Sequence, residues 1–215
     1  MGGGAPVSVQ SMTNTDTRDV QATLAQIRAL ASAGADLVRV SVYDEECARA
    51  VRALVDGSPV PLVADIHFDH RLAIQAVENG IAKVRINTGN IGELADCLKM
   101  HHVPVRIGVN TGSLEKWVLE QYGRTPRGMV ESALGHARLL EDCGFDDIVI
   151  SVKASSVRET VEANRLLRKA CAYPLHIGVT EAGEPGAGNI KSAIGIGSLL
   201  LDGIGDTIRV SLTGD

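Results

Sequence analysis

The chain has 215 residues, of which 45% are hydrophobic and only 3% aromatic, so aliphatic side chains have to form its core. Its formal net charge of −5 argues against a protein that binds nucleic acid. We find no signal peptide and no apolar run of transmembrane length, and therefore expect a cytoplasmic protein without a membrane anchor.

Short apolar runs alternate along the whole chain with longer segments in which apolar residues recur at helical spacing. This alternation predicts eight strands, at residues 7–12, 37–42, 61–66, 83–87, 103–110, 147–153, 174–180 and 207–213. It predicts seven helices between them, from Val20 to Gly34 and at residues 44–55, 71–78, 91–101, 126–143, 155–170 and 190–201. The segment 111–126, which contains Trp117 and Tyr122, is expected to be a long loop that packs on the protein or forms part of a lid.

Each pair of a strand and a helix has the length of a βαβ unit, and eight such units close into a TIM-type (β/α)8 barrel. An open doubly wound sheet is the alternative, but it would carry a glycine-rich phosphate motif after its first strand. The predicted barrel lacks its eighth helix, which would leave apolar surface uncovered. We therefore expect residues 1–215 to be one domain of a larger protein.

Basic residues recur on the predicted strands, near the ends where the active sites of barrels lie. They are Arg39, Arg85, Arg106, Lys153 and Arg209, with Lys191 in the helix before the last strand. The polar residues nearby are Asn87, Asn110 and Ser211, and the carboxylates are Asp65 and Glu181. A single arginine there would fit a structural ion pair, but two carboxylates cannot neutralise six cations, and unpaired buried charge is costly. We therefore expect an anionic ligand, since arginine matches phosphate oxygens in a bidentate way.

Three weaker signals accompany these cations. The glycine-rich loop 183–188 precedes a helix after the seventh strand, a position where barrels often bind phosphate through backbone N–H groups. His67 follows Asp65 by two residues, so we expect it to handle a proton or a hydrogen bond rather than to ligate a metal. Asn87 and Asn110 stand in turn-like sequences and fit either turn residues or ligand contacts.

Several stretches resemble one enzyme family closely, in order along nearly the whole chain. They include Gln10-Ser11-Met12-Thr13-Asn14, Ala64-Asp65-Ile66-His67-Phe68, Arg106-Ile107-Gly108-Val109-Asn110, Ser151-Val152-Lys153 and Asp206-Thr207-Ile208-Arg209-Val210-Ser211. The family is 4-hydroxy-3-methylbut-2-enyl diphosphate synthase of the non-mevalonate isoprenoid pathway. Thr88 departs from this resemblance, because the family usually has proline at that position.

The resemblance implies an oxidoreductase that reductively opens 2-C-methyl-D-erythritol 2,4-cyclodiphosphate with electrons from flavodoxin or ferredoxin. It implies that Arg39, Arg85, Arg106 and Lys153 hold the diphosphate, and that Asn87, Asn110, Arg209 and Ser211 complete the pocket. Asp65, His67, Glu181 and Lys191 are additional candidates for this site.

The family also carries a C-terminal domain, in which three cysteines and a glutamate ligate a [4Fe–4S] cluster, and its full-length members are homodimers. This chain lacks that domain, and its four cysteines do not match those ligands. Cys47, Cys97, Cys143 and Cys171 lie in predicted helices without metal-ligand spacing, so we expect free thiols. The chain thus resembles the substrate-binding part, and we expect it to bind the cyclic diphosphate weakly without turning it over. The alternatives are a pterin-binding barrel of the dihydropteroate synthase kind and a non-catalytic barrel that binds a phosphorylated metabolite.

Overall fold

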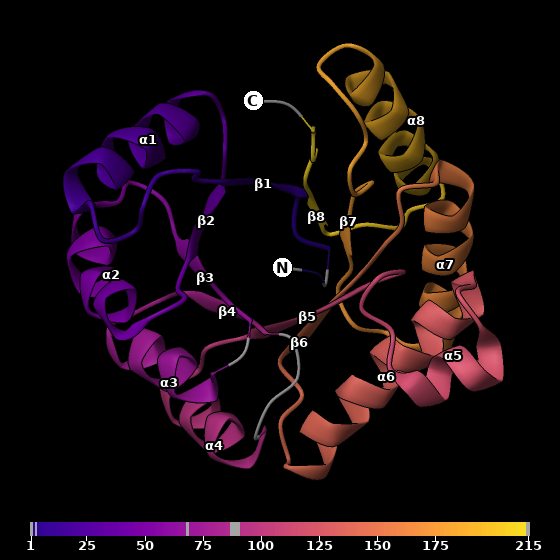
Figure 1. Ribbon diagram of the computed structural model, residues 1–215, viewed down its shortest axis with the longest axis horizontal. Helices are drawn as coiled ribbons and strands as arrows, with labels where there is room; N and C mark the ends of the chain where they lie inside the picture. Colours follow the sequence, from indigo (N-terminus) through magenta and orange to yellow (C-terminus); the bar gives the residue numbers. More distant parts are fainter. Residues whose placement is uncertain (1, 3, 68, 87–90, 214–215) are drawn as a thin grey trace. The chain divides into compact units, whose positions relative to one another are not determined.

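The computed structural model describes residues 2, 4–67, 69–86 and 91–213 of the chain. Its strands are β1 (Ser8–Met12), β2 (Leu37–Ser41), β3 (Leu62–Ile66), β4 (Lys83–Ile86), β5 (Val105–Asn110), β6 (Ile148–Lys153), β7 (His176–Ile177) and β8 (Thr207–Ile208). Its helices are α1 (Val20–Ser32), α2 (Glu45–Gly57), α3 (His70–Glu78), α4 (Ile91–His101), α5 (Lys116–Tyr122), α6 (Pro126–Asp142), α7 (Val157–Ala170) and α8 (Ala187–Leu201). Strands and helices alternate in the predicted order, except that both α5 and α6 lie between β5 and β6 (Figure 1).

The chain divides into two compact units, which we describe separately. The β1–β5 unit consists of Ser8–Ile107 and Ala137–Ile148. The β6–β8 unit consists of Met1–Val7, Gly108–His136 and Val149–Asp215. The boundary therefore passes through β5, α6 and the start of β6.

In the β1–β5 unit, five parallel strands pair with one another in chain order. One face of this sheet is apolar and carries Val38, Val40, Ala64 and Val84, all fully buried. Helices α1 and α3 contact β2, β3 and β4, and α2 packs between α1 and α3. Burying aliphatic side chains between the helices and this face provides the main driving force for folding of the unit.

Aspartate caps begin the first three helices of this unit. The side chains of Asp19, Asp44 and Asp69 accept hydrogen bonds from backbone N–H groups in the first turns of α1, α2 and α3, respectively. Each cap satisfies one of the N–H groups that have no partner within the helix, and it places a negative charge at the positive end of the helix dipole. The strand-to-helix turns that follow β1, β2 and β3 are thus fixed locally by the sequence.

In the β6–β8 unit, β7 pairs with β8 in parallel, and Ile150 of β6 forms a bridge with Leu175. Helix α7 packs against α8 and is tied to β6 by two buried side chains. Asn164 donates to the Val152 carbonyl (2.9 Å), and Thr160 donates to the Ala154 carbonyl (3.0 Å). These bonds hold the end of β6, and with it Lys153, at a defined place against α7.

The structure corrects three details of the sequence-based prediction. Strands β7 and β8 are only two residues long. Beyond them, the two segments are joined by isolated hydrogen bonds and not by a continuous ladder; one example is the bond from Ala182 N–H to the Ser211 carbonyl (3.1 Å). The segment 111–126 is not a long loop, since it contains α5, whose Trp117 is exposed. Cys143 and Cys171 lie just beyond the ends of α6 and α7, while Cys47 and Cys97 lie within helices as predicted.

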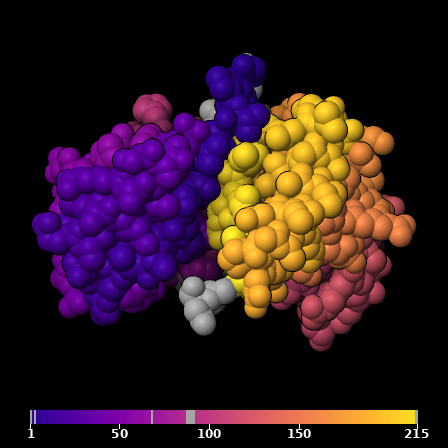
Figure 2. Space-filling view, turned by 90° about the horizontal axis from the view of Figure 1, so that it is seen from above, coloured from indigo at the N-terminus to yellow at the C-terminus, as the bar shows by residue number. Residues whose placement is uncertain are grey.

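The surface of α8 is unusually apolar. Its exposed residues include Ile190, Ile194 and Leu201, and Figure 2 shows this part of the chain, in yellow tones, at the surface. Residues 209–213, the last that the structure describes, contain no helix. Among the described residues, no helix has the combination of length and hydrophobicity that crossing a membrane would require.

Candidate functional site

The charged side chains on the strands of the β1–β5 unit lie on the sheet face opposite to the apolar one. Because side chains alternate along a strand and the pairing register is fixed, residues that pair across strands form rows on this face. One row, which we call the arginine row, consists of Ser41, Asp65, Arg85 and Arg106, on β2, β3, β4 and β5. The neighbouring row, two residues toward the start of each strand, consists of Met12, Arg39, Val63 and Lys83.

Asp65 is the acidic centre of this face. Its side chain is 3% exposed, and its Oδ1 accepts a hydrogen bond from Arg85 Nη1 at 2.9 Å. Its Oδ2 lies 3.4 Å from Arg39 Nε and 3.6 Å from His67 Nε2. The structure therefore brings three of the predicted site residues, Arg39, Arg85 and His67, around the buried carboxylate of a fourth, Asp65. Arg106 lies beside Arg85 in the same row.

The arginines keep this carboxylate ionised. Burial alone would raise the pKa of Asp65, but the positive charges of Arg39, Arg85, His67 and Arg106 outweigh burial and lower it. A carboxylate that stays charged in a buried place orients the guanidinium groups around it by charge-assisted hydrogen bonds. Arg39 and Arg85 contact this carboxylate and Arg106 lies close enough to lower its pKa, so the basic residues on the strands of this face outnumber their one carboxylate.

Two neighbours of the arginines were not predicted to take part. Arg39 donates to the Met12 sulfur from both Nε (3.2 Å) and Nη2 (2.8 Å), a contact for which the sequence gives no signal. Lys83 is 2% exposed and shares the sheet face with Arg85. The alternation of the strand could have found Lys83, because it precedes Arg85 by two residues.

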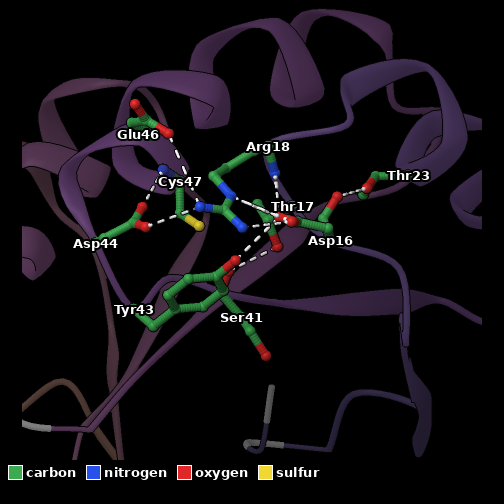
Figure 3. Close-up of polar contacts among 9 residues, drawn as sticks. All are labelled: Asp16, Thr17, Arg18, Thr23, Ser41, Tyr43, Asp44, Glu46 and Cys47. Atoms are coloured by element: carbon green, nitrogen blue, oxygen red, sulfur yellow. Dashed lines mark hydrogen bonds and ion pairs between the residues drawn. The ribbon is translucent and has the colours of Figure 1, made fainter.

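The loops that follow β1 and β2 are joined by a clamp centred on Arg18 (Figure 3). The guanidinium of Arg18 binds Asp16 (Nη2 to Oδ2, 2.6 Å) and lies 5.5 Å from the centre of the Tyr43 ring. The Tyr43 hydroxyl donates to Asp16 (3.0 Å), and the Thr17 hydroxyl donates to the Ser41 carbonyl (2.7 Å). Hydrogen bonds from Arg18 are the main reason that the pKa of Asp16 is lowered. The clamp fixes both loops next to Ser41, at the end of the arginine row.

In the β6–β8 unit, Lys153 and Arg209 approach each other across Gly178. A Cβ atom at position 178 would lie 2.3 Å from the Arg209 carbonyl oxygen and 3.0 Å from Lys153 Nζ. Arg209 Nη2 also donates to the Ser211 hydroxyl at 3.1 Å. The structure therefore brings together Lys153, Arg209 and Ser211, three of the predicted site residues, within this unit.

We expect Gly178→Ala to destabilise the protein by about 1–3 kcal/mol, because the new methyl group would displace the backbone at Arg209 and the ammonium of Lys153. Denaturant unfolding measures the change. The matched control is Gly197→Ala in α8, where nothing lies within 4 Å of the added carbon, so alanine should be neutral or stabilising. Equal effects of the two substitutions would contradict a tight approach at Gly178.

The remaining predicted site residues have other surroundings. Asn110 closes a turn, because its Oδ1 accepts from Gly112 N–H at 2.9 Å. Glu181 is exposed and adopts a left-handed backbone conformation (φ 48°) just before the glycine-rich loop. Lys191 is half-buried in the first turns of α8. Asn87 lies outside the described residues, as does Thr88.

The cysteines of this chain do not fit an iron–sulfur cluster. All four are free thiols, and Cys47 is buried within α2. Within the part of the chain that the structure describes, no group of three or more histidine, cysteine or acidic side chains is placed to hold a metal ion. Burial is the main reason that the pKa values of Cys47 and Cys97 are raised, which disfavours the thiolates that clusters require.

Sequence comparison assigns the chain to a family. A model described as the GcpE TIM-barrel domain matches residues 1–215. The chain belongs to this family. The predicted TIM barrel is therefore confirmed, and so is the resemblance from which the family was recognised.

Curated relatives match the whole of this GcpE TIM-barrel domain. The identity is 59% to a protein of Magnetococcus marinus, 57% to one of Geobacter sulfurreducens and 56% to one of Ruminiclostridium cellulolyticum. Each is named 4-hydroxy-3-methylbut-2-en-1-yl diphosphate synthase (flavodoxin). The match takes in 100% of this chain and 60–63% of those proteins, so the chain spans about three fifths of their length.

Solved structures share the fold at low sequence identity. Dihydropteroate synthase from Stenotrophomonas maltophilia has a TM-score of 0.68 at 18% identity, covering 96% of this chain and 86% of that one. The carboxyl transferase domain of Rhizobium etli pyruvate carboxylase has a TM-score of 0.62 at 14% identity, covering 95% of this chain and 40% of that one. At such identities the likeness is one of fold alone, and it does not favour a pterin-binding function.

Proposed function

We propose that the arginine row, together with Arg39 of the neighbouring row, binds a diphosphate and that this chain is the substrate-binding part of a 4-hydroxy-3-methylbut-2-en-1-yl diphosphate synthase. The observation that carries the proposal is the gathering of Arg39, Arg85 and Arg106 around the single carboxylate of Asp65. The name of the curated relatives supports it, because they match this chain over its whole length. A doubly negative ligand would balance the positive excess of this face, and guanidinium groups are well suited to phosphate oxygens.

In the proposed reaction, the full-length enzyme reductively opens 2-C-methyl-D-erythritol 2,4-cyclodiphosphate in the cytoplasm. Flavodoxin is the proposed electron donor, following the relatives' name, with ferredoxin as the alternative. The [4Fe–4S] cluster of the family would be held outside this chain, since the residues described here do not fit it. We propose a homodimer for the full-length protein.

Each side chain of the described face has a role in this proposal. Arg39, Arg85 and Arg106 bind the phosphate groups, and Asp65 keeps Arg39 and Arg85 in place by charge-assisted contacts. His67 lies at the exposed edge, where it can donate a hydrogen bond to the ligand. The family resemblance adds Asn87, Asn110, Lys153, Arg209 and Ser211 to the predicted substrate contacts, with Glu181 and Lys191 as further candidates.

Calorimetric titration of the 215-residue chain with the cyclic diphosphate tests the proposal. We expect Arg85→Met to weaken binding by roughly 10- to 100-fold, because it removes a charge-assisted contact worth about 1.5–3 kcal/mol. The matched control is Arg52→Met, which removes an exposed arginine of α2 that pairs with Asp56 on the surface. Unfolding curves of both variants separate lost binding from lost stability.

Two outcomes would contradict the proposal. One is binding by Arg85→Met that is as tight as binding by the wild type. The other is a wild-type chain that does not prefer the cyclic diphosphate, because it either binds no such ligand or binds a pterin more tightly. Turnover is not expected from this chain alone, so activity with a reductant would contradict the assignment of the redox centre to another part of the enzyme.

A further inference from the structure

Lys83 is a buried lysine next to the arginine row. It is the first residue of β4, it is 2% exposed, and its register partner on β3 is the apolar Val63. Since Lys83 and Arg85 are two residues apart on one strand, their side chains share a face and their Cα atoms are about 6.7 Å apart. Lys83 therefore lies one row away from Arg85 and Arg106, and in the same row as Arg39, the third proposed phosphate contact.

Charged residues stand on the same sheet face as Lys83 on the neighbouring strands, or next to them. They are Arg85 on its own strand, Asp65 and Arg39 on the β3 and β2 side, and Arg106 and Asp147 on the β5 and β6 side. Asp147 directly precedes β6, and its backbone carbonyl accepts a hydrogen bond from the N–H group of Val105 (3.0 Å). Of these groups, Arg106 disfavours the charged form of Lys83 and Asp147 favours it.

In this environment, the protonation of Lys83 is sensitive to nearby charges. Burial is the main cause that lowers the pKa of Lys83 to about 7, Arg106 lowers it further, and Asp147 opposes the change. A lysine of this kind is close to half protonated in a neutral solution, so a modest change in the local field changes its charge.

We propose that Lys83 takes up a proton from the solvent when a diphosphate binds to the arginine row. The inference rests on the proposed function, because it needs an anion at Arg85 and Arg106. The bound negative charge offsets the repulsion between those guanidinium groups and the Lys83 ammonium. In the step itself, the lone pair of Lys83 Nζ accepts one proton from the buffer, and no other bond is made or broken.

The other groups of the face are less suited to this response. The guanidinium groups are charged at all relevant pH values. The pKa of Asp65 is already lowered by its arginines, so this carboxylate has no proton to exchange near neutrality. The side chain of His67 is 47% exposed, and a Lys83 variant separates any contribution of this histidine from that of the lysine. Lys83 is therefore a positioning residue whose positive charge near the ligand increases when the ligand binds.

The test is calorimetric titration of the 215-residue chain with the cyclic diphosphate in buffers of different ionisation enthalpy. This ligand is suitable because its phosphates are esterified and keep a constant charge over the pH range used. With the pKa of Lys83 near 7, we expect an uptake of up to about 0.9 proton per ligand at pH 8 and at most about 0.1 at pH 6. Lys83→Met should abolish this uptake at pH 8.

The control is Lys116→Met, which removes a lysine whose side chain is 91% exposed in α5 and should leave the uptake unchanged. Binding with the same proton uptake in the wild type and in Lys83→Met would overturn the inference and leave the proposed function standing. If neither protein binds the cyclic diphosphate, the proposed function fails and the inference fails with it. Retention of the uptake in Lys83→Met would assign the proton to another group, such as His67.

Discussion

Replacing Asp65 with asparagine is expected to lower the free energy of unfolding by about 3–5 kcal/mol. Asparagine has nearly the same shape, so the substitution removes the negative charge and little else. The carboxylate is 3% exposed and in contact with both Arg85 (2.9 Å) and Arg39 (3.4 Å). Removing it leaves buried guanidinium groups to repel one another in a place where water cannot screen them. Denaturant unfolding at neutral pH measures the loss.

The matched control is Asp56→Asn, which removes a carboxylate that pairs with Arg52 at 3.1 Å on the surface, where both side chains are at least 60% exposed. An exposed pair of this kind contributes less than about 1 kcal/mol. The pKa of Asp65 is lowered in the folded protein, so its contribution is fully present above the ordinary carboxyl pKa of 3.8 and is lost as the pH falls below it. A loss no larger than that of the control, or one independent of pH in acid, would contradict the central role of Asp65.

The ligand should partly replace the missing charge. A diphosphate bound to Arg39, Arg85 and Arg106 supplies negative charge close to the position that Asp65 occupies. We therefore expect the cyclic diphosphate to bind Asp65→Asn more tightly than the wild type and to raise the midpoint of unfolding more in the variant, since stabilisation by a ligand of the folded state increases with the logarithm of its affinity. This comparison links the stability of the face to its proposed function.

The sequence was sufficient to predict that each of the strands β2 to β5 has one apolar and one charged face. Arg39, Asp65, Arg85 and Arg106 occupy alternate positions of four predicted strands, and period-two alternation sends such residues to one side of a sheet. The sequence is compatible with two roles for these residues, a structural ion pair and an anion-binding site. The structure contains the ion pairs of Arg39 and Arg85 with Asp65, and it places Arg106 next to Arg85 in the same row.

The register could not be predicted, because it depends on pairing between segments that are far apart in the chain. A shift of one residue would have turned a strand's charged residues into the apolar helix interface. That Asp65 pairs with Arg85, and Arg85 with Arg106, became known only from the structure. The same holds for the contact between Met12 and Arg39, since a thioether next to a guanidinium leaves no pattern in the sequence.

Helix α5 was missed for a related reason. It is only seven residues long, and its N-cap residue, Glu115, makes no capping hydrogen bond through its side chain. Instead, Glu115 accepts a hydrogen bond from Ser132 of α6 (2.7 Å) and forms an ion pair with His136 of the same helix. Tertiary contacts with α6 thus support a helix that is too short to be stable by itself.

Replacing Lys83 with methionine is expected to raise the free energy of unfolding by about 2–4 kcal/mol at pH 7. Methionine matches the length of the lysine side chain but carries no charge, so it fits the same buried space. The gap between a pKa of about 7 in the folded protein and the ordinary 10.5 corresponds to a penalty of about 4–5 kcal/mol in acid, at 1.36 kcal/mol per pKa unit. For a protein of this size, the variant should unfold roughly 4–16 °C higher than the wild type.

The pH dependence of this gain distinguishes a charge effect from better packing. Between pH 7 and 10.5 the unfolded chain holds a proton on Lys83 that the folded protein has released, so the stability of the wild type rises with pH through this window. The advantage of Lys83→Met should therefore be largest below pH 7 and shrink as the pH approaches 10. The exposed control Lys116→Met should stay within about 0.5 kcal/mol of the wild type throughout. A gain that does not change with pH would mean that packing and not charge sets the penalty, and would remove the basis for proton uptake by Lys83.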